Sequence, residues 1–489
     1  MIVYLQREGG IYMLPEELVN LVADIVNLKC EKQNVELKKA AGGTPERLYN
    51  TLSSFSNQNG GGIIIFGIDE DDGYKVCGVY DPQDLQKKVT EQALQMMPVV
   101  RPLFTVCKVG EAVVVSAEIS ECELIDKPCY YKGTGKLRGS FVRVGEADLP
   151  MTEYEIYSFE AFKRKIHDEI RTVPNSSISA INKNELTVFL AKLKSEKPNL
   201  ATLSDEENLA LSGILIDNEL TVAGLMLFGL YPQGLFPQLC ITAVVVPGKE
   251  IGDIGEENDR FLDNKKIEGT IPQMIDGAIN FVKRNMKSKT IIDDEGKRAD
   301  KSEYPLKAVR EIIINAVVHR DYSINTENSP VRIMLFSDRL EVENPGGLYG
   351  RITIDNLGKV GADTRNPFIA SNLEILINTE NRFSGIPTIR NEMKKAGLLP
   401  PLFENTRGVF KVTLFNSESA YPEGEESLTT EKILGFCKTP KSREEIAKYL
   451  GLGSMSYAMR NITPLINNGQ IKMTKPDTPK SKNQRYLTR

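Results

Sequence analysis

The chain has 489 residues, of which 41% are hydrophobic and 26% charged, with a formal net charge of −5. At about 150 residues per domain this length predicts roughly three or four domains, and the composition excludes a disordered or fibrous chain. No segment approaches the ~20 consecutive apolar residues of a membrane helix, and residues 1–10 lack the layout of a secretory signal. We therefore expect a cytoplasmic protein with no membrane partner.

The cysteines and histidines exclude several kinds of enzyme. The seven cysteines never form a C-x-x-C pair, and the two histidines are His167 and His319. This pattern disfavours a structural zinc site and rules out an H-E-x-x-H zinc protease. A Ser-His-Asp triad would have to use one of these two histidines.

The first 150 residues predict an α+β domain. Proline at a first turn and apolar residues at helical spacing predict a helix over 15–27, and Thr44-Pro45 predicts another over 44–55. Three glycines precede an apolar run at 63–68, which we interpret as a buried strand. Further strands follow up to about Pro150, and a helix is predicted over 152–173.

Three carboxylates near the start of the chain are candidate metal ligands. Glu31 and Glu36 lie five residues apart, and Asp69 follows the predicted strand, so the three converge if the segment around Glu36 is a neighbouring strand. The bland alternative is a Glu36–Lys38 pair on a strand and a solvated turn at 69–72.

Two stretches, CEKQNVELKKA and SSFSNQNGGGIIIFGID, resemble the Alba-like (AlbA_2) domain shared with Schlafen proteins, over about residues 14–150. The resemblance implies contact with RNA or DNA. In some Schlafens an equivalent acidic trio acts as a metal-dependent ribonuclease site, so it also implies a nuclease alternative that uses Glu31, Glu36 and Asp69.

A second α/β region is predicted downstream. Helices are expected over 184–195, 204–212 and 269–285, and a further helix begins at Ser302 or Pro305 with LKAVREIIINAVVHR. On this mostly apolar helix Glu311, Asn315 and His319 are spaced i, i+4 and i+8, which places them on one face. We expect that face to line a cleft. The alternative is that Glu311 pairs with an arginine such as Arg310 or Arg332 and seals a core.

The segments REIIINAVVHRDY, ENPGGL (343–348), RNP (365–367) and SGIP (384–387) resemble a divergent GHKL-type, RecG-like ATP-binding domain of bacterial regulators, over about residues 304–415. The resemblance implies ATP or ADP with Mg²⁺. Glu311 would activate water and Asn315 would hold Mg²⁺. The resemblance also implies that the cofactor contacts His319, Asn344, Gly346, Gly347 and Gly385. Asn344 stands where an Asp is usual and Phe383 where a small residue is expected, which weakens hydrolysis as an expectation.

The last 59 residues form a basic module after a polar, acidic linker. Twelve Lys and Arg stand against four Asp and Glu from Glu431 to Arg489, a balance of +8 that leaves −13 for the rest. Ser442 and Glu445 form a capping-box pattern, glycines 451 and 453 form a turn, and strands are predicted over 470–474 and 484–488. This layout predicts a winged helix-turn-helix that binds DNA. The candidate contacts are Ser456, Arg460, Asn461, Lys475, Lys480, Lys482 and Arg485.

Helices are predicted in that module over 430–437, over 442–450 and from about Ser454 onward, and Pro464 interrupts the third of them. Winged helices also serve as protein-docking or dimer modules. The fold class expected for the whole chain is α+β multidomain. Its predicted parts are an Alba-like α/β domain (14–152), a helical connecting region (153–228), a GHKL-like α/β sandwich (229–416), a linker (417–429) and a winged helix (430–489). The predicted function is a DNA-binding bacterial transcriptional regulator, acting as a homodimer and modulated by nucleotide. The alternative is a metal-dependent Schlafen-type nuclease acting in defence.

Overall fold

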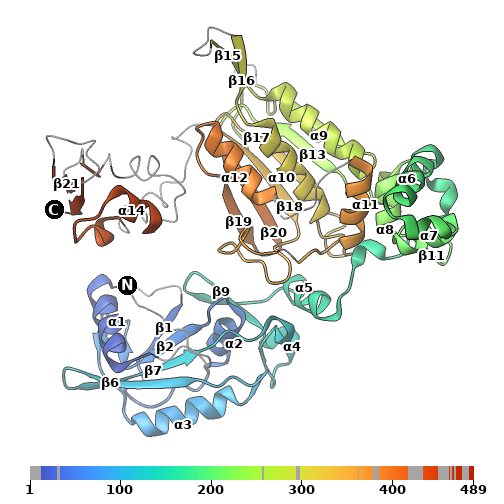
Figure 1. Ribbon diagram of the computed structural model, residues 1–489. Helices are drawn as coiled ribbons and strands as arrows, with labels where there is room; N and C mark the ends of the chain where they lie inside the picture. Colours follow the sequence, from blue (N-terminus) through green and yellow to red (C-terminus); the bar gives the residue numbers. More distant parts are fainter. Residues whose placement is uncertain are drawn as a thin grey trace.

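The computed structural model describes residues 13–29, 34–255, 258–292, 298–361, 363–377, 385–416, 433–449, 462, 465–466, 470–475 and 484–488. Figure 1 shows an N-terminal sheet domain in blue and cyan, a middle domain with a larger sheet, and a small C-terminal group. The α+β multidomain class is thereby confirmed. No helix within these residues is long and apolar enough to cross a membrane.

The N-terminal domain is built on a four-stranded sheet in the order β1 (Val35–Lys38), β2 (Gly62–Phe66), β7 (Ala112–Ile119) and β6 (Leu103–Val109). β1 runs parallel to β2, and the other pairs are antiparallel. Alternation along β2 divides the core, because Ile63 and Ile65 pack with α1 (Pro15–Leu28). Ile64 and Phe66 point the other way, toward α2 (Tyr49–Asn57) and α3 (Pro82–Ala93). The predicted helix at 15–27 and the buried strand are confirmed.

The helix predicted over 44–55 begins later than expected, at Tyr49. The Gln92 side chain of α3 accepts a hydrogen bond from Leu48 N and donates one to the Pro45 carbonyl, which holds this stretch outside the helix. A tertiary contact therefore fixes the helix boundary. The remaining elements of the domain are short: β3 (Ile68–Asp69), β4 (Lys75–Val76), β5 (Met96–Met97), η1 (Leu124–Asp126), β8 (Tyr130–Tyr131), α4 (Lys136–Gly139), β9 (Phe141–Val144) and β10 (Ala147–Pro150).

A single helix, α5 (Glu153–Arg164), follows the N-terminal domain. The sequence predicted a helix to residue 173, but Lys165 adopts a left-handed conformation (φ 53°) and ends α5 there. The chain then turns through η2 (Asp168–Ile170).

The middle domain contains a six-stranded sheet in the order β14-β13-β17-β18-β20-β19, in which the β13–β17 pair is parallel and the others antiparallel. Helices α9, α10 and α12 cover one face (Figure 1). The strands are β13 (Ile241–Val245), β14 (Asp263–Ile267), β17 (Val331–Leu335), β18 (Arg339–Pro345), β19 (Leu402–Thr406) and β20 (Val409–Phe415). The helices are α9 (Ile271–Asn285), α10 (Leu306–Val318), α11 (Pro367–Ile377) and α12 (Gly385–Lys395). A hairpin of β15 (Ser288–Ile292) and β16 (Arg298–Ser302) projects from this domain.

A helical group packs at one end of this sheet. It comprises η3 (Ile178–Ala180), α6 (Lys183–Glu196), η4 (Pro198–Thr202), α7 (Asp205–Leu211), β11 (Leu215–Ile216), β12 (Glu219–Leu220), α8 (Val222–Phe228) and η5 (Pro232–Gly234). One hydrophobic core extends from Val173 through these helices to Leu414. The helices that the sequence assigned to a connecting region therefore share the core of the sheet that begins after residue 229.

The C-terminal group has a small core formed by Ile433, Cys437, Ile446, Ile462, Leu465, Ile471 and Tyr486. Its described elements are α14 (Arg443–Tyr449) and a hairpin of β21 (Ile471–Met473) and β22 (Tyr486–Thr488). Ser442 N donates to Glu445 Oε2 (2.7 Å) and Glu445 N donates to Ser442 Oγ (3.2 Å), so the capping box and the strand pair are confirmed. The centre of the predicted third helix lies outside the described residues.

Candidate functional site

The amino end of α12 lies against a polar stripe on α10. Glu311 and Asn315 are partly exposed, whereas the intervening residues Ile312 to Ile314 are buried. A Cβ added to Gly385, the first residue of α12, would lie 2.9 Å from Asn315 Nδ2 and 3.2 Å from Glu311 Oε2. The structure thus brings Glu311, Asn315 and Gly385 together. The first turn of a helix has N–H groups without intrahelical partners and a partial positive charge, a combination that suits an anion.

Burial raises the pKa of Glu311, and the nearby Arg310 and Lys307 partly offset this rise. Of the two alternative partners considered for Glu311, Arg332 pairs instead with Glu343, with 3.7 Å between Nη1 and Oε2, whereas Arg310 lies close enough to lower the pKa of Glu311. His319 caps α10, and burial together with Arg365 lowers its pKa to about 4. This histidine is therefore uncharged at neutral pH.

Asn344 lies in β18 on the same face as Leu340 and Val342, which belong to the core that α10 joins. Its side chain is buried, at 4% exposure, and its Oδ1 has no hydrogen-bond partner among the described residues. A buried acceptor without a donor costs about 1–3 kcal/mol. A ligand that donates an N–H group to Asn344 would remove that cost.

The glycines after Asn344 are held by a buried ion pair. Asp321 pairs with Arg365, and Arg365 Nη2 donates to the Gly347 carbonyl (3.0 Å). Gly346 has φ +109°, and a Cβ there would lie 2.7 Å from Asp321 Cβ. The Tyr154 hydroxyl of α5 donates to Asp321 Oδ2 (2.7 Å). Burial raises the pKa of Tyr154 to about 12, so this hydroxyl remains a donor at neutral pH.

A second buried acid joins the segment before α6 to the start of α11. Glu169 is fully buried and accepts hydrogen bonds from Phe368 N (2.9 Å) and Ile369 N (2.7 Å), at the amino end of α11. Burial raises the pKa of Glu169 to about 7. Next to it, Asn366 Nδ2 donates to the Val318 and Arg320 carbonyls at the end of α10.

Of the two interpretations of the acidic residues in the N-terminal domain, the structure contains the Glu36–Lys38 pair on a strand, here β1. Arg143 pairs with Glu36 (2.8 Å), which also pairs with Lys38, while Asp69 pairs with Lys39 (2.5 Å). Glu31 lies outside the described residues. Among the residues that can be placed, no three His, Cys, Asp or Glu side chains are grouped as a metal site. Both described carboxylates of the trio are therefore paired with basic side chains of this domain.

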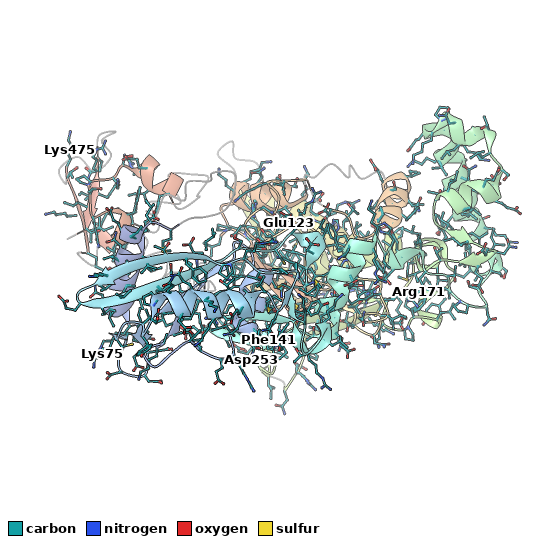
Figure 2. The ribbon with its side chains drawn as sticks, turned by 90° about the horizontal axis from the view of Figure 1, so that it is seen from below. Lys75, Glu123, Phe141, Arg171, Asp253 and Lys475 are labelled. Atoms are coloured by element: carbon teal, nitrogen blue, oxygen red, sulfur yellow. The ribbon has the colours of Figure 1, made fainter. Side chains whose placement is uncertain are left out.

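Few of the predicted DNA contacts can be placed. Lys475 is exposed, and Figure 2 shows it at the outer edge of the C-terminal group. Arg485 Nη1 pairs with Glu445 (3.2 Å) and donates to the Pro440 carbonyl. Ser456, Arg460, Asn461, Lys480 and Lys482 lie outside the described residues, so their roles stay predictions.

Four residues with no predicted role organise this region: Tyr154, Glu169, Asp321 and Arg365. Asp321 and Arg365 belong to the HRDY and RNP motifs, so the sequence did mark two of them. Tyr154 and Glu169 lie in a segment without a comparable motif, and only their contacts reveal them.

Four segments of the chain match known families. Residues 31–152 match "Schlafen, AlbA_2", and residues 328–414 match "Putative ATP-dependent DNA helicase recG C-terminal" (HATPase_c_4). These two matches confirm the predicted Schlafen-type and RecG-like segments. Residues 430–488 match the C-terminal domain of Filamentation induced by cAMP (Fic-like) proteins, and residues 159–242 match a domain of unknown function, DUF8451. Asn344, Gly346, Gly347 and Gly385 lie inside the RecG-like match, while Glu311 and Asn315 precede it.

Two solved structures are similar over part or most of this chain. The DIP2311 protein from Corynebacterium diphtheriae is 19% identical over 97% of this chain and 97% of its own, with a TM-score of 0.41. The N-terminal domain of a RecG-related protein from Nitrosomonas europaea is 26% identical over 27% of this chain and 92% of its own, with a TM-score of 0.23. No curated protein matches this chain.

Proposed function

We propose that this protein is a DNA-binding transcriptional regulator whose middle domain binds ATP or ADP with Mg²⁺. The contact of Glu311 and Asn315 on α10 with Gly385 at the start of α12 carries the proposal, because it joins candidate metal ligands to a helix end that favours phosphate. The RecG-like family match over residues 328–414 supports an ATPase-like domain.

The side chains around this contact suit the parts of a nucleotide. Asn344 offers a buried acceptor to an exocyclic amino group, and the first turn of α12 offers the backbone N–H groups of Gly385 and Ile386 to phosphates, since Pro387 has none. The oxygens of Asn315 and Glu311 are hard ligands of the kind that Mg²⁺ prefers, and bound Mg²⁺ would neutralise phosphate charge there. Asn344 lacks the charge of the usual Asp, so we propose that the nucleotide acts mainly as a signal and that turnover is slow.

The C-terminal group is the proposed DNA-binding part. The segment from Glu431 to Arg489 carries a net charge of +8. The lysine-containing loop lies between strands β21 and β22 in the sequence, and Lys475 is exposed. Lys and Arg that neutralise phosphates release counterions, which makes binding sensitive to salt. We propose a homodimer, since a two-fold protein matches palindromic DNA sites. The Schlafen-type match supports a further nucleic-acid contact in the N-terminal domain.

Thermal melting of the full chain tests the nucleotide part. Millimolar ATP or ADP with Mg²⁺ should raise the melting temperature, because a ligand at 100 times its Kd stabilises by about 2.7 kcal/mol. Asn315→Ala should abolish the rise. Asn264→Ala makes the same chemical change at an exposed position of the edge strand β14 and should leave the rise intact. The absence of any rise in the unaltered chain refutes nucleotide binding.

Duplex binding tests the DNA part. Fluorescence anisotropy with a labelled duplex should show binding that weakens with salt. If three lysines neutralise phosphates, a plot of the logarithm of the binding constant against the logarithm of salt concentration should have a slope of about −3. Deletion of residues 428–489 should remove this binding. A truncated chain that binds the duplex as well as the full chain contradicts the assignment of DNA binding to this segment.

A further inference from the structure

Helix α5 contacts both large domains. Toward the N-terminal domain, Glu160 pairs with Lys136, and the Phe159 ring lies 6.0 Å from Lys127 Nζ. Toward the middle domain, the Phe162 ring meets the Tyr349 ring edge to face, with 5.4 Å between centroids. Because α5 contacts both domains, a rotation of one domain relative to the other would change the contacts of this helix.

The amino end of α5 is fastened to the glycine loop, defined here as residues 346–348. The Tyr154 hydroxyl donates to Asp321 Oδ2 (2.7 Å) and accepts from Arg365 Nη1 (3.2 Å), while Arg365 also holds the Gly347 carbonyl. The Tyr154 ring packs tightly against Gly408, since a Cβ on Gly408 would lie 2.6 Å from the ring. A displacement of the glycine loop must therefore move Arg365, Asp321 or Tyr154.

The glycine loop also borders a cavity between the two domains. This cavity has a volume of about 750 Å³ and is lined by Leu348, Arg351 and Asn405 on one side. Leu124, Lys127 and Phe159 line the other side. Asn405 Oδ1 accepts from Leu348 N (2.9 Å), so the loop also fixes one wall of the cavity. The facing surfaces of the two domains are therefore not packed against each other at this point.

We propose that Tyr154, Asp321 and Arg365 form a latch that transmits movement of the glycine loop to α5 and so sets the angle between the N-terminal and middle domains. The ligand that moves the loop is the nucleotide of the proposed function, and on this point the inference rests on that function. The mechanical connection itself is independent of any ligand. It gives the regulator a route by which a small molecule alters the placement of its Schlafen-type domain.

Hydrogen exchange of the full chain, followed by mass spectrometry, tests the latch without a ligand. Gly346→Ala places a methyl group against Asp321 and Arg365 and forces the loop to shift. Exchange should rise about tenfold in α5 and in residues 121–127 across the cavity, as expected when a charge-assisted hydrogen bond is lost. Gly397→Ala is the matched control, because Gly397 also has a positive φ (+72°) but has no atom within 4 Å of its Cβ position.

Tyr154→Phe removes the hydroxyl and keeps the ring against Gly408, so it supplies the same test if Gly346→Ala does not fold. It should raise exchange in residues 121–127 by itself. Where Gly346→Ala does fold, combining the two substitutions should raise exchange there no further than either one alone. Faster exchange confined to the middle domain in both variants would overturn the latch.

The two proposals fail separately. If ATP with Mg²⁺ raises the melting temperature but neither the nucleotide nor Gly346→Ala changes exchange in α5 and residues 121–127, the latch is refuted and nucleotide binding stands. If no nucleotide binds but Gly346→Ala loosens α5 and residues 121–127, the latch stands and nucleotide binding is refuted.

Discussion

Replacement of Glu169 by Gln should remove a loss of folding stability that the middle domain undergoes as the pH rises. Burial raises the pKa of this carboxyl from 4.5 to about 7, although hydrogen bonds from Ile369 N and Phe368 N partly oppose the rise. The folded chain therefore holds a proton on Glu169 between about pH 4.5 and 7 that the unfolded chain has lost. Stability falls as pH rises through this window, and above about pH 7 the full penalty is present.

The magnitude follows from the change in proton affinity. A rise from 4.5 to about 7 corresponds to roughly 3 kcal/mol at about 1.4 kcal/mol per tenfold change, as an upper bound. The glutamine side chain of the variant cannot ionise but retains one acceptor for the amide groups of α11, so Glu169→Gln should cost about 1 kcal/mol at pH 5. Between pH 5 and 8 the stability of the variant should improve relative to the unaltered chain by as much as about 3 kcal/mol.

Urea unfolding followed by circular dichroism at pH 5, 6, 7 and 8 measures this difference. Glu206→Gln, at an exposed position of α7, is the matched control and should follow the unaltered chain at every pH. Parallel curves for Glu169→Gln and the unaltered chain would refute the reasoning, because they would show that the buried carboxyl does not change its ionisation on folding.

Two further substitutions test the candidate sites. Gly385→Ala places a methyl group 2.9 Å from Asn315 Nδ2. Calorimetry should show that this variant binds ATP with Mg²⁺ at least about tenfold more weakly, which corresponds to about 1.4 kcal/mol. The control variant Gly42→Ala, whose methyl group would have no atom within 4 Å, should bind as the unaltered chain does. Glu36→Gln removes a carboxylate that pairs with the buried Arg143, which also pairs with Asp148, and should lower the free energy of unfolding by about 2 kcal/mol. If instead it abolishes Mg²⁺- or Mn²⁺-dependent RNA cleavage with stability unchanged, the nuclease alternative is supported.

Local patterns in the sequence determined most of the elements and part of the candidate site. The alternation at Ile63 to Phe66 set both faces of β2, and Ser442 with Glu445 marked the start of α14. The polar stripe of Glu311 and Asn315 on an apolar helix marked the partly exposed side of α10, which faces Gly385 of α12. These features depend on periods of two or 3.6 residues and on contacts three residues apart, which a sequence displays directly.

Tertiary structure alone decided which distant side chains meet. Arg143 lies more than a hundred residues from Glu36 in the sequence and forms an ion pair with the carboxylate that was predicted to bind a metal. Gln92 binds Leu48 N, so α2 begins later than its sequence predicts. Tyr154 reaches Asp321 across 167 residues and fastens α5 to the glycine loop. Such pairs depend on how loops close and how helices pack on the sheet, and no local period encodes that geometry.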